Sequence, residues 1–220
     1  NKQFKSEKRV KISSAKNRGI GAASNQAIEN GSGSIILQLD GDDTLEPTAV
    51  ESLLTQMYDG HVCAYGNFRR IDPSGEIIDN GWEEARYSRE RLLRSMIVHH
   101  PRMFRRDAWE KAGKHDEELT NAVDYDLFLR LSEIGTMTHV RTILYSYRIL
   151  PTSTSRAKEQ IQTQNTFEVV RRSLERSGVL NFDLHVPNPS SPRTFRIQDK
   201  RFKNPTEDNL FNRNNLPKTE

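Results

Sequence analysis

The chain has 220 residues, of which 34% are hydrophobic and 29% charged, and its formal net charge is +3. This length suits one domain of ordinary size with an extension, and no apolar run approaches the roughly 18 residues that a membrane-spanning helix needs. Cys63 is the single cysteine, which argues against a disulfide framework, and we interpret it as a small buried hydrophobic residue.

Basic residues are concentrated in the first 18 positions, where seven lysines and arginines face one acid, Glu7. Such a local positive field attracts phosphates or an acidic polymer, but an ordinary solvated basic surface accounts for it about as well. The segment contains no recognisable nucleic-acid-binding module, so we expect no nucleic-acid partner. It also lacks a signal-peptide core and an initiating Met, and we expect the chain to be part of a longer polypeptide.

The first elements predict a strand, helix, strand unit. Residues 9–13 alternate basic and apolar side chains, which favours a short strand, and a glycine turn at 17–21 then opens a helix over 22–29. Residues 35–39 form an apolar run typical of a strand buried on both faces of a sheet.

This apolar run ends in Asp40, Gly41, Asp42 and Asp43. Clustered carboxylates repel each other unless a cation neutralises them, and hard oxygen ligands suit Mg²⁺ or Mn²⁺ together with substrate phosphates. The alternative is a solvated turn after a buried strand, because Asp and Gly are ordinary turn residues.

The middle of the chain continues the alternation of helices and strands. A helix is predicted from 46–48 to about 58, followed by a hairpin made of residues 63–71, a turn at 72–75 and residues 76–78. Ser88 offers a simple cap to a helix through about 96, and residues 99–105 fit a short strand or a loop. Asp107 is predicted to cap a short helical turn that ends near 113.

The last third begins with a predicted helix over 124–133, which carries Leu127, Phe128 and Leu131 on one face. A strand is expected over 136–149 and an amphipathic helix over 160–176. After Gly178 the sequence is rich in Pro and Asn and loses its periodicity, so we expect a poorly ordered tail.

Three further segments contain candidate ligand-binding groups. The glycine turn before residues 22–29 can receive an anion at a helix N-terminus, although a purely structural turn is equally compatible. His99 and His100 could supply a metal ligand, or could be ordinary core or loop histidines. Asp124 and Asp126 lie at a helix start, where a capping role is the default interpretation.

In this order, the motifs resemble those of the GT-A glycosyltransferases of the family 2 type, and most closely the second catalytic domain of bacterial chondroitin and hyaluronan polymerases. The resemblance covers roughly residues 9–178. The segments that carry it are residues 16–25, Asp40 to Asp43 with the following Leu45-Glu46-Pro47, 97–104, and 121–133 with 123–131 at its centre. Position 123 is Val, where many family 2 members have Glu.

The resemblance implies an α/β fold with a Rossmann-like mixed sheet of the GT-A type that lacks its first strand. We expect residues 1–150 to form the catalytic domain, 151–180 a C-terminal helical extension, and 181–220 a poorly ordered tail or linker.

The resemblance also implies an inverting transfer of a sugar, glucuronic acid in the polymerases, from a UDP-sugar to the end of an oligo- or polysaccharide. The implied cofactor is Mn²⁺ or Mg²⁺, with Asp42 and His100 as metal ligands and His99 as the competitor of His100. Asp124 matches the catalytic base. The residues implied in binding the nucleotide sugar are Asn17, Gly19, Gly21, Asn25, Asp40 and Asp42.

We therefore expect a cytoplasmic enzyme and leave open a peripheral association with the inner face of the membrane. The alternative function is a noncatalytic sugar or nucleotide-sugar binding module derived from a glycosyltransferase.

Overall fold

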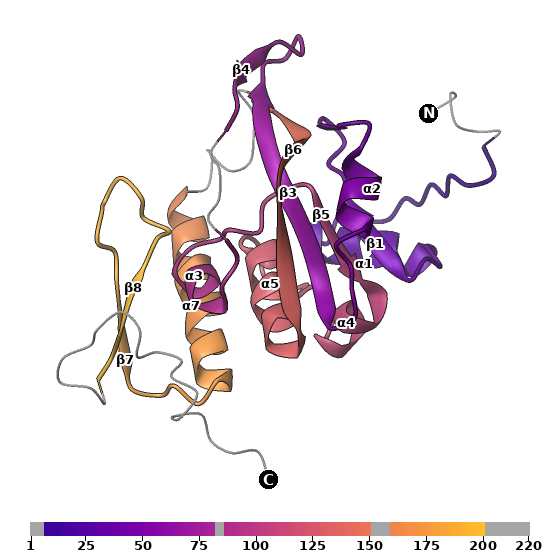
Figure 1. Ribbon diagram of the computed structural model, residues 1–220. Coiled ribbons are helices and arrows are strands. Elements are labelled where there is room, and N and C mark those ends of the chain that lie inside the picture. Colours follow the sequence, from indigo (N-terminus) through magenta and orange to yellow (C-terminus); the bar gives the residue numbers. More distant parts are fainter. Residues whose placement is uncertain (1–6, 82–85, 151–158, 201–220) are drawn as a thin grey trace.

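A six-stranded mixed sheet forms the centre of the computed structural model, which describes residues 7–81, 86–150 and 159–200 (Figure 1). The strand order is β1 (Ile35–Gln38), β5 (Arg102–Arg105), β3 (His61–Ile71), β6 (Thr136–Arg148) and β2 (Thr44–Leu45), and β4 (Ile77–Asp79) pairs with β3. β3 and β6 run parallel, whereas the other neighbours are antiparallel. The mixed sheet agrees with the predicted α/β class.

The helices of the described residues are α1 (Ile20–Asn30), α2 (Ala49–Leu54), α3 (Arg89–Arg94), α4 (Arg106–Lys111), α5 (Val123–Ile134) and α7 (Glu159–Arg176). α2, α4 and α5 contact strands of the sheet, whereas α7 packs against α5 and α3. None of the helices in this part of the chain is long and apolar enough to cross a membrane.

Two hydrophobic clusters cover opposite faces of the sheet. Along β3, Cys63 and Tyr65 belong to the larger cluster and the intervening Ala64 to the smaller one. Successive side chains of a strand point to opposite faces, so the alternation places α5, with its fully buried Leu127, on one face. α2, with its fully buried Leu53, lies on the other.

Most predicted elements are confirmed, with ends that differ by a few residues. These are the helix at 22–29, the hairpin around 72–75, the helix at 124–133, the strand at 136–149 and the helix at 160–176. Ser88 caps α3 as expected, because its hydroxyl accepts a hydrogen bond from the Arg91 N–H at 3.1 Å.

Several local predictions were wrong. Residues 9–13 form no strand and are exposed, because alternation alone provides no hydrogen-bonding neighbour. β1 is only half-buried, since β5 is its one pairing partner among the described strands. The predicted helix to about 58 ends at Leu54. Asp107 makes no cap and pairs with Lys111 within α4.

The segment after residue 180 also differs from the tail expected there. β7 (Phe182–His185) and β8 (Arg196–Asp199) pair as an antiparallel hairpin beside α7 (Figure 1). Phe195 and Ile197 are buried in the larger cluster, so apolar burial holds this segment in place. The expected boundaries at 150 and 180 stay predictions, and residues 201–220 lie outside the described residues.

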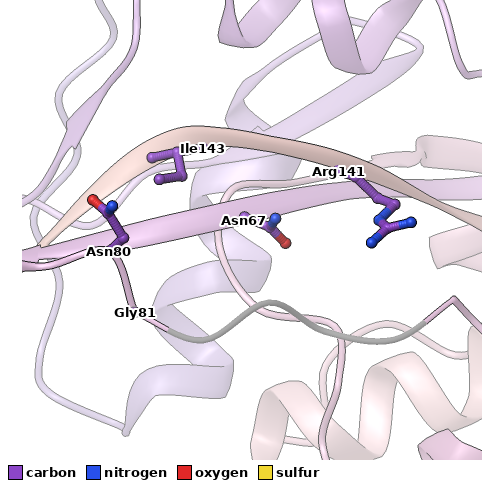
Figure 2. A pocket seen from close by; sticks show the side chains of 5 residues that line it. All are labelled: Asn67, Asn80, Gly81, Arg141 and Ile143. Carbon is purple, nitrogen blue, oxygen red and sulfur yellow. The ribbon is translucent and has the colours of Figure 1, made fainter.

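A pocket of about 350 Å³ lies beside the β3–β6 pair (Figure 2). Its lining residues are Asn67, Asn80, Gly81, Arg141 and Ile143.

Candidate active site

The acidic turn follows β1 and is fixed to the end of β6. Asp43 is buried, and its carboxylate accepts a hydrogen bond from the Arg148 N–H at 2.7 Å. The Arg148 guanidinium in turn donates to the Asp42 carbonyl at 2.8 Å. Asp43 therefore has a structural role, whereas Asp40 and Asp42 are exposed and available to a ligand.

Tyr145 and His100 lie against the same turn. The Tyr145 hydroxyl accepts a hydrogen bond from the Asp40 N–H at 3.2 Å, and the His100 ring stacks on Tyr145 with 5.2 Å between ring centroids. Burial, followed by the charge of Arg102, holds the pKa of His100 well below its usual value. The imidazole is therefore neutral at pH 7, which is the form that binds metals.

Asp124 lies in the first turn of α5 and pairs with a buried arginine. Its Oδ2 lies 3.0 Å from Nη1 of Arg102, and its Oδ1 accepts a hydrogen bond from the Tyr125 N–H at 2.9 Å. The Arg102 side chain is 6% exposed and that of Asp124 is 44% exposed, so the carboxylate still reaches solvent.

These contacts keep Asp124 ionised. Burial raises the pKa of Asp124, but the charge and hydrogen bond of Arg102 outweigh it, and the net pKa lies below the usual value. Arg102 is held in turn by the Val98 carbonyl at 3.2 Å and by the ring of Phe128, whose centroid is 5.0 Å from its Cζ.

Arg102 connects the acidic turn to Asp124. Gln38 at the end of β1 is the register partner of Arg102, so the turn begins beside this guanidinium. Burial raises the pKa of Asp40, Arg102 lowers it, and the charges of Asp42 and Asp124 raise it again. Because Arg102 pairs in register with Gln38 and contacts Asp124 at 3.0 Å, the end of β1 and Asp124 lie beside the same arginine, and we treat the acidic turn and Asp124 as one candidate site.

The chemistry of this site fits a hard divalent cation. The charges of Asp42 and Asp124 raise the pKa of Asp40, and a bound cation would relieve this repulsion. Within the described ranges, however, no group of three or more His, Cys, Asp or Glu side chains is already arranged around a metal position. The types of side chain at this site suit a divalent metal ion, but the described residues do not form a complete coordination shell.

Four predicted nucleotide-sugar residues lie in or just before α1. Two belong to the preceding turn and two to the helix itself. Asn17 and Gly19 form the turn before α1, where the Asn17 side chain accepts from the Gly19 N–H at 3.0 Å and Gly19 has φ of 98°. Gly21 packs against the loop before α5, since a Cβ there would lie 2.4 Å from the Asp116 carbonyl oxygen.

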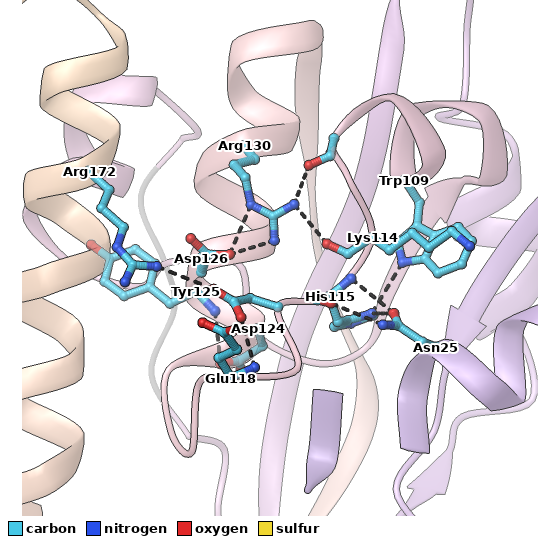
Figure 3. Close-up of polar contacts among 12 residues, drawn as sticks. Asn25, Trp109, Lys114, His115, Glu118, Asp124, Tyr125, Asp126, Arg130 and Arg172 are labelled. Carbon is cyan, nitrogen blue, oxygen red and sulfur yellow. Dashed lines mark hydrogen bonds and ion pairs between the residues drawn. The ribbon is translucent and has the colours of Figure 1, made fainter. Parts of the chain in front are cut away.

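Asn25 is attached to the same loop. It is 5% exposed, and its amide nitrogen donates to the His115 carbonyl at 3.0 Å (Figure 3). The same nitrogen donates to Oε1 of Glu117, also at 3.0 Å. Both donors of the amide are therefore used. In this structure Gly21 and Asn25 hold α1 against this loop, and their assignment as nucleotide-sugar contacts stays a prediction.

The two acids at the start of α5 have different roles. Ala122, with φ of 59°, is the N-cap residue and makes no side-chain cap, whereas the Asp124 carboxylate accepts the Tyr125 N–H in the first turn. Asp126 is 2% exposed and pairs with Arg130 one turn later (Figure 3). No local pattern indicates the roles of Tyr145, Arg148 and Arg102, because each role depends on a contact with a distant segment.

The sequence matches the family model described as glycosyl transferase family 2 over residues 1–113. It is 44% identical over 176 residues to a chondroitin synthase from Escherichia coli, an overlap of 79% of this chain and 26% of that protein. It is 42% identical over 185 residues to a hyaluronan synthase from Pasteurella multocida, an overlap of 83% of this chain and 19% of that protein. The chain thus spans about a quarter or less of these relatives.

A crystal structure of S. aureus TarS 1-349 in complex with UDP-GlcNAc has a similar fold, with a TM-score of 0.62 at 14% identity. The match covers 84% of this chain and 54% of TarS 1-349. This likeness confirms the predicted GT-A fold. Since the family model matches more than half of the sequence, the chain belongs to glycosyl transferase family 2.

Proposed function

We propose that this chain is the catalytic part of an inverting transferase that moves a sugar from a UDP-sugar to the end of a growing, glycosaminoglycan-like polysaccharide. The observation that carries the proposal is the shared site of the acidic turn and Asp124 around Arg102. The chondroitin and hyaluronan synthase relatives support a glycosaminoglycan-like product, and the resemblance to the second domain of such polymerases supports glucuronic acid as the donor sugar.

Asp124 is the group that we assign to proton transfer. Its carboxylate is ionised and partly exposed, so it can accept the proton of the acceptor hydroxyl. The hydroxyl oxygen then forms a bond to the anomeric carbon of the donor, and the bond from that carbon to the UDP oxygen breaks. UDP leaves with the bonding electron pair, and attack from the face opposite UDP inverts the anomeric centre.

The acidic turn is assigned to the donor side. Asp42 would hold the Mn²⁺ or Mg²⁺ ion with His100, and Asp40 would contact the nucleotide sugar. A bound divalent ion offsets negative charge on the departing diphosphate. Asp43 and Arg148 keep the turn in place, and the neutral His100 ring adds no positive charge that would repel the cation.

The test is an assay of the full-length protein with Mn²⁺, UDP-glucuronate and a hexosamine-ended oligosaccharide. The wild type should release UDP, and a chelator should stop the release. Asp124→Asn should lower kcat by about 10²–10⁴-fold, because the proton acceptor is lost, while the Kd for UDP-glucuronate stays nearly unchanged.

The matched control is Asp107→Asn, which removes an exposed carboxylate from α4 and should leave kcat as in the wild type. Loss of donor binding in Asp124→Asn would instead make Asp124 structural. A wild type that binds UDP-glucuronate or the oligosaccharide without releasing UDP would favour the noncatalytic binding module.

A further inference from the structure

The pocket between β3 and β6 belongs to neither the acidic turn nor the Asp124 pair. Asn67 and Ile143 are register partners across the two strands, and Arg141 comes from the bulged segment of β6 next to them. The remaining wall is made by Asn80 and Gly81 after β4. Figure 2 shows the Asn67 amide and the Arg141 guanidinium pointing to the same side of the strands.

A continuous row of contacts connects this pocket to Asp124. Arg102, the partner of Asp124, is the register neighbour of Tyr65, and cross-strand neighbours share a face of the sheet. Tyr65 stacks on His139 with 4.8 Å between ring centroids, and His139 Nε2 lies 2.7 Å from Oδ1 of Asn67. Asn67 is two residues beyond Tyr65 on β3, so the pocket lies about 7 Å further along this face.

The polar groups of the pocket are mainly donors. The Asn67 carbonyl oxygen is engaged by His139, which leaves its N–H₂ group as the part that can serve a ligand. Arg141 is exposed and supplies a positive charge and a planar set of N–H donors. A donor-rich, cationic pocket of this size is suited to an anionic group on a sugar, and a carboxylate accepts hydrogen bonds in this geometry.

We propose that this pocket binds the carboxylate of a uronic acid residue through Arg141 and Asn67, next to the site where the sugar is transferred. The inference rests on the proposed function, because it names the class of sugar that is held beside that site. The carboxylate can come from the acceptor chain or from the donor sugar, and the two sources are distinguished below.

The test measures binding of two matched oligosaccharides to the full-length protein by calorimetry. One alternates hexosamine and uronic acid, and the other is the same compound with its carboxyl groups reduced to alcohols. Arg141→Ala should raise the Kd of the acidic oligosaccharide about tenfold, because a charge-assisted hydrogen bond is lost, and should leave the Kd of the reduced compound unchanged. Arg141→Lys should retain part of the affinity.

The control variant is Arg91→Ala, which removes an exposed arginine from α3 and should change neither Kd. In the second arm, the same variants are titrated with UDP-glucuronate and UDP-glucose. A loss of affinity confined to UDP-glucuronate would support the carboxylate pocket and show that the carboxylate belongs to the donor sugar. Equal losses for acidic and neutral ligands, no loss in either arm, or failure of the wild type to bind any of the ligands would overturn the proposal.

The calorimetric experiment and the UDP-release assay test the two proposals independently. Carboxylate-dependent binding without UDP release would refute the proposed transfer and retain the pocket. If UDP is released but Arg141→Ala binds the acidic and neutral ligands with the same Kd values as the wild type, the proposed carboxylate pocket is refuted and the proposed transfer is not.

Discussion

Arg102 is a buried cation at the centre of the site, and its environment explains why it tolerates burial. Its Nη1 contacts both Asp124 and the Val98 carbonyl, and its plane lies over Phe128. A buried charge is costly unless it is paired and hydrogen-bonded, and these contacts meet that condition at Nη1. We infer that Arg102 is a positioning residue, since it acts through Asp124.

Replacing Arg102 should therefore change the ionisation of Asp124. In Arg102→Gln the charge that lowers the pKa of Asp124 is removed, so the acidic limb of the kcat profile should move to higher pH. Arg102→Lys keeps the charge and should keep the acidic limb, while kcat falls about tenfold because the two-point contact of Nη1 is lost. Steady-state kinetics between pH 4 and pH 8 would measure both effects, and an unmoved limb in Arg102→Gln would contradict the assignment.

His115 gives the fold a predictable dependence on pH. Burial, followed by the charges of Arg102 and Arg130, lowers the pKa of His115 to about 4, against an ordinary value of 6.5. Between these two values the unfolded chain binds a proton that the folded protein excludes. The free energy of unfolding must therefore decrease as pH falls through this window, and the contribution of His115 should reach about 2 kcal/mol at pH 5.

His115→Gln should remove this contribution while retaining an acceptor for the Trp109 indole N–H, which donates to Nδ1 of His115 at 3.1 Å. Urea unfolding at pH 7 and at pH 5 would measure this effect: the free energy of unfolding should decrease less between the two pH values in His115→Gln than in the wild type. His185→Gln, at an exposed position of β7, should retain the pH dependence of the wild type. An equal pH dependence in wild type and His115→Gln would refute the explanation.

At the scale of elements, α1 is joined to the loop before α5 by close backbone packing. Gly21→Ala would normally favour a helix by about 1 kcal/mol, but the added Cβ would lie 2.4 Å from the Asp116 carbonyl oxygen. Backbone atoms cannot move away cheaply, so the clash should dominate and lower the free energy of unfolding by about 1–3 kcal/mol. Denaturant unfolding would test this.

Gly41→Ala is the matched control for stability, because its Cβ would meet no atom within 4 Å. If Gly21→Ala were as stable as Gly41→Ala, α1 would not be held against the 115–117 loop in the way described.

At the scale of the whole molecule, the β7–β8 hairpin completes the larger hydrophobic cluster. Phe195 is 2% exposed, packs edge-on against Phe167 of α7 at 4.5 Å between centroids, and donates its N–H to the Arg94 carbonyl at 2.7 Å. The hairpin is thus attached to both α7 and α3, although it pairs with no strand of the central sheet.

If the hairpin unfolds together with the rest of the domain, the cavity left by Phe195→Ala should lower the free energy of unfolding by about 3–5 kcal/mol. If the hairpin opens on its own, the loss should be smaller, with faster hydrogen exchange confined to residues 182–199. Leu180→Ala, at a position that is 76% exposed, should do neither. Similar effects of the two substitutions would show that the hairpin is not anchored by Phe195.

Elements with strong local signals could be predicted from the chain alone. Periodic apolar residues predicted α5 and α7, the turn at 72–75 predicted the hairpin, and the motifs around the acidic turn and Asp124 resemble those of the family. These features depend on side chains a few residues apart, which is why a single chain displays them. Local alternation alone was insufficient at residues 9–13, since a strand also needs a neighbour.

Which acids lie together and which have a structural role depends on long-range packing. Asp40, Asp42 and Asp43 are chemically equivalent in the sequence, yet contact with Arg148 buries Asp43 alone. The Asn25 amide binds the loop at 115–117, a contact between distant segments that the glycine-turn motif does not indicate. The ion pair of Arg102 with Asp124 joins residues on different elements, and such long-range contacts follow from how the sheet and helices pack, which no local pattern encodes.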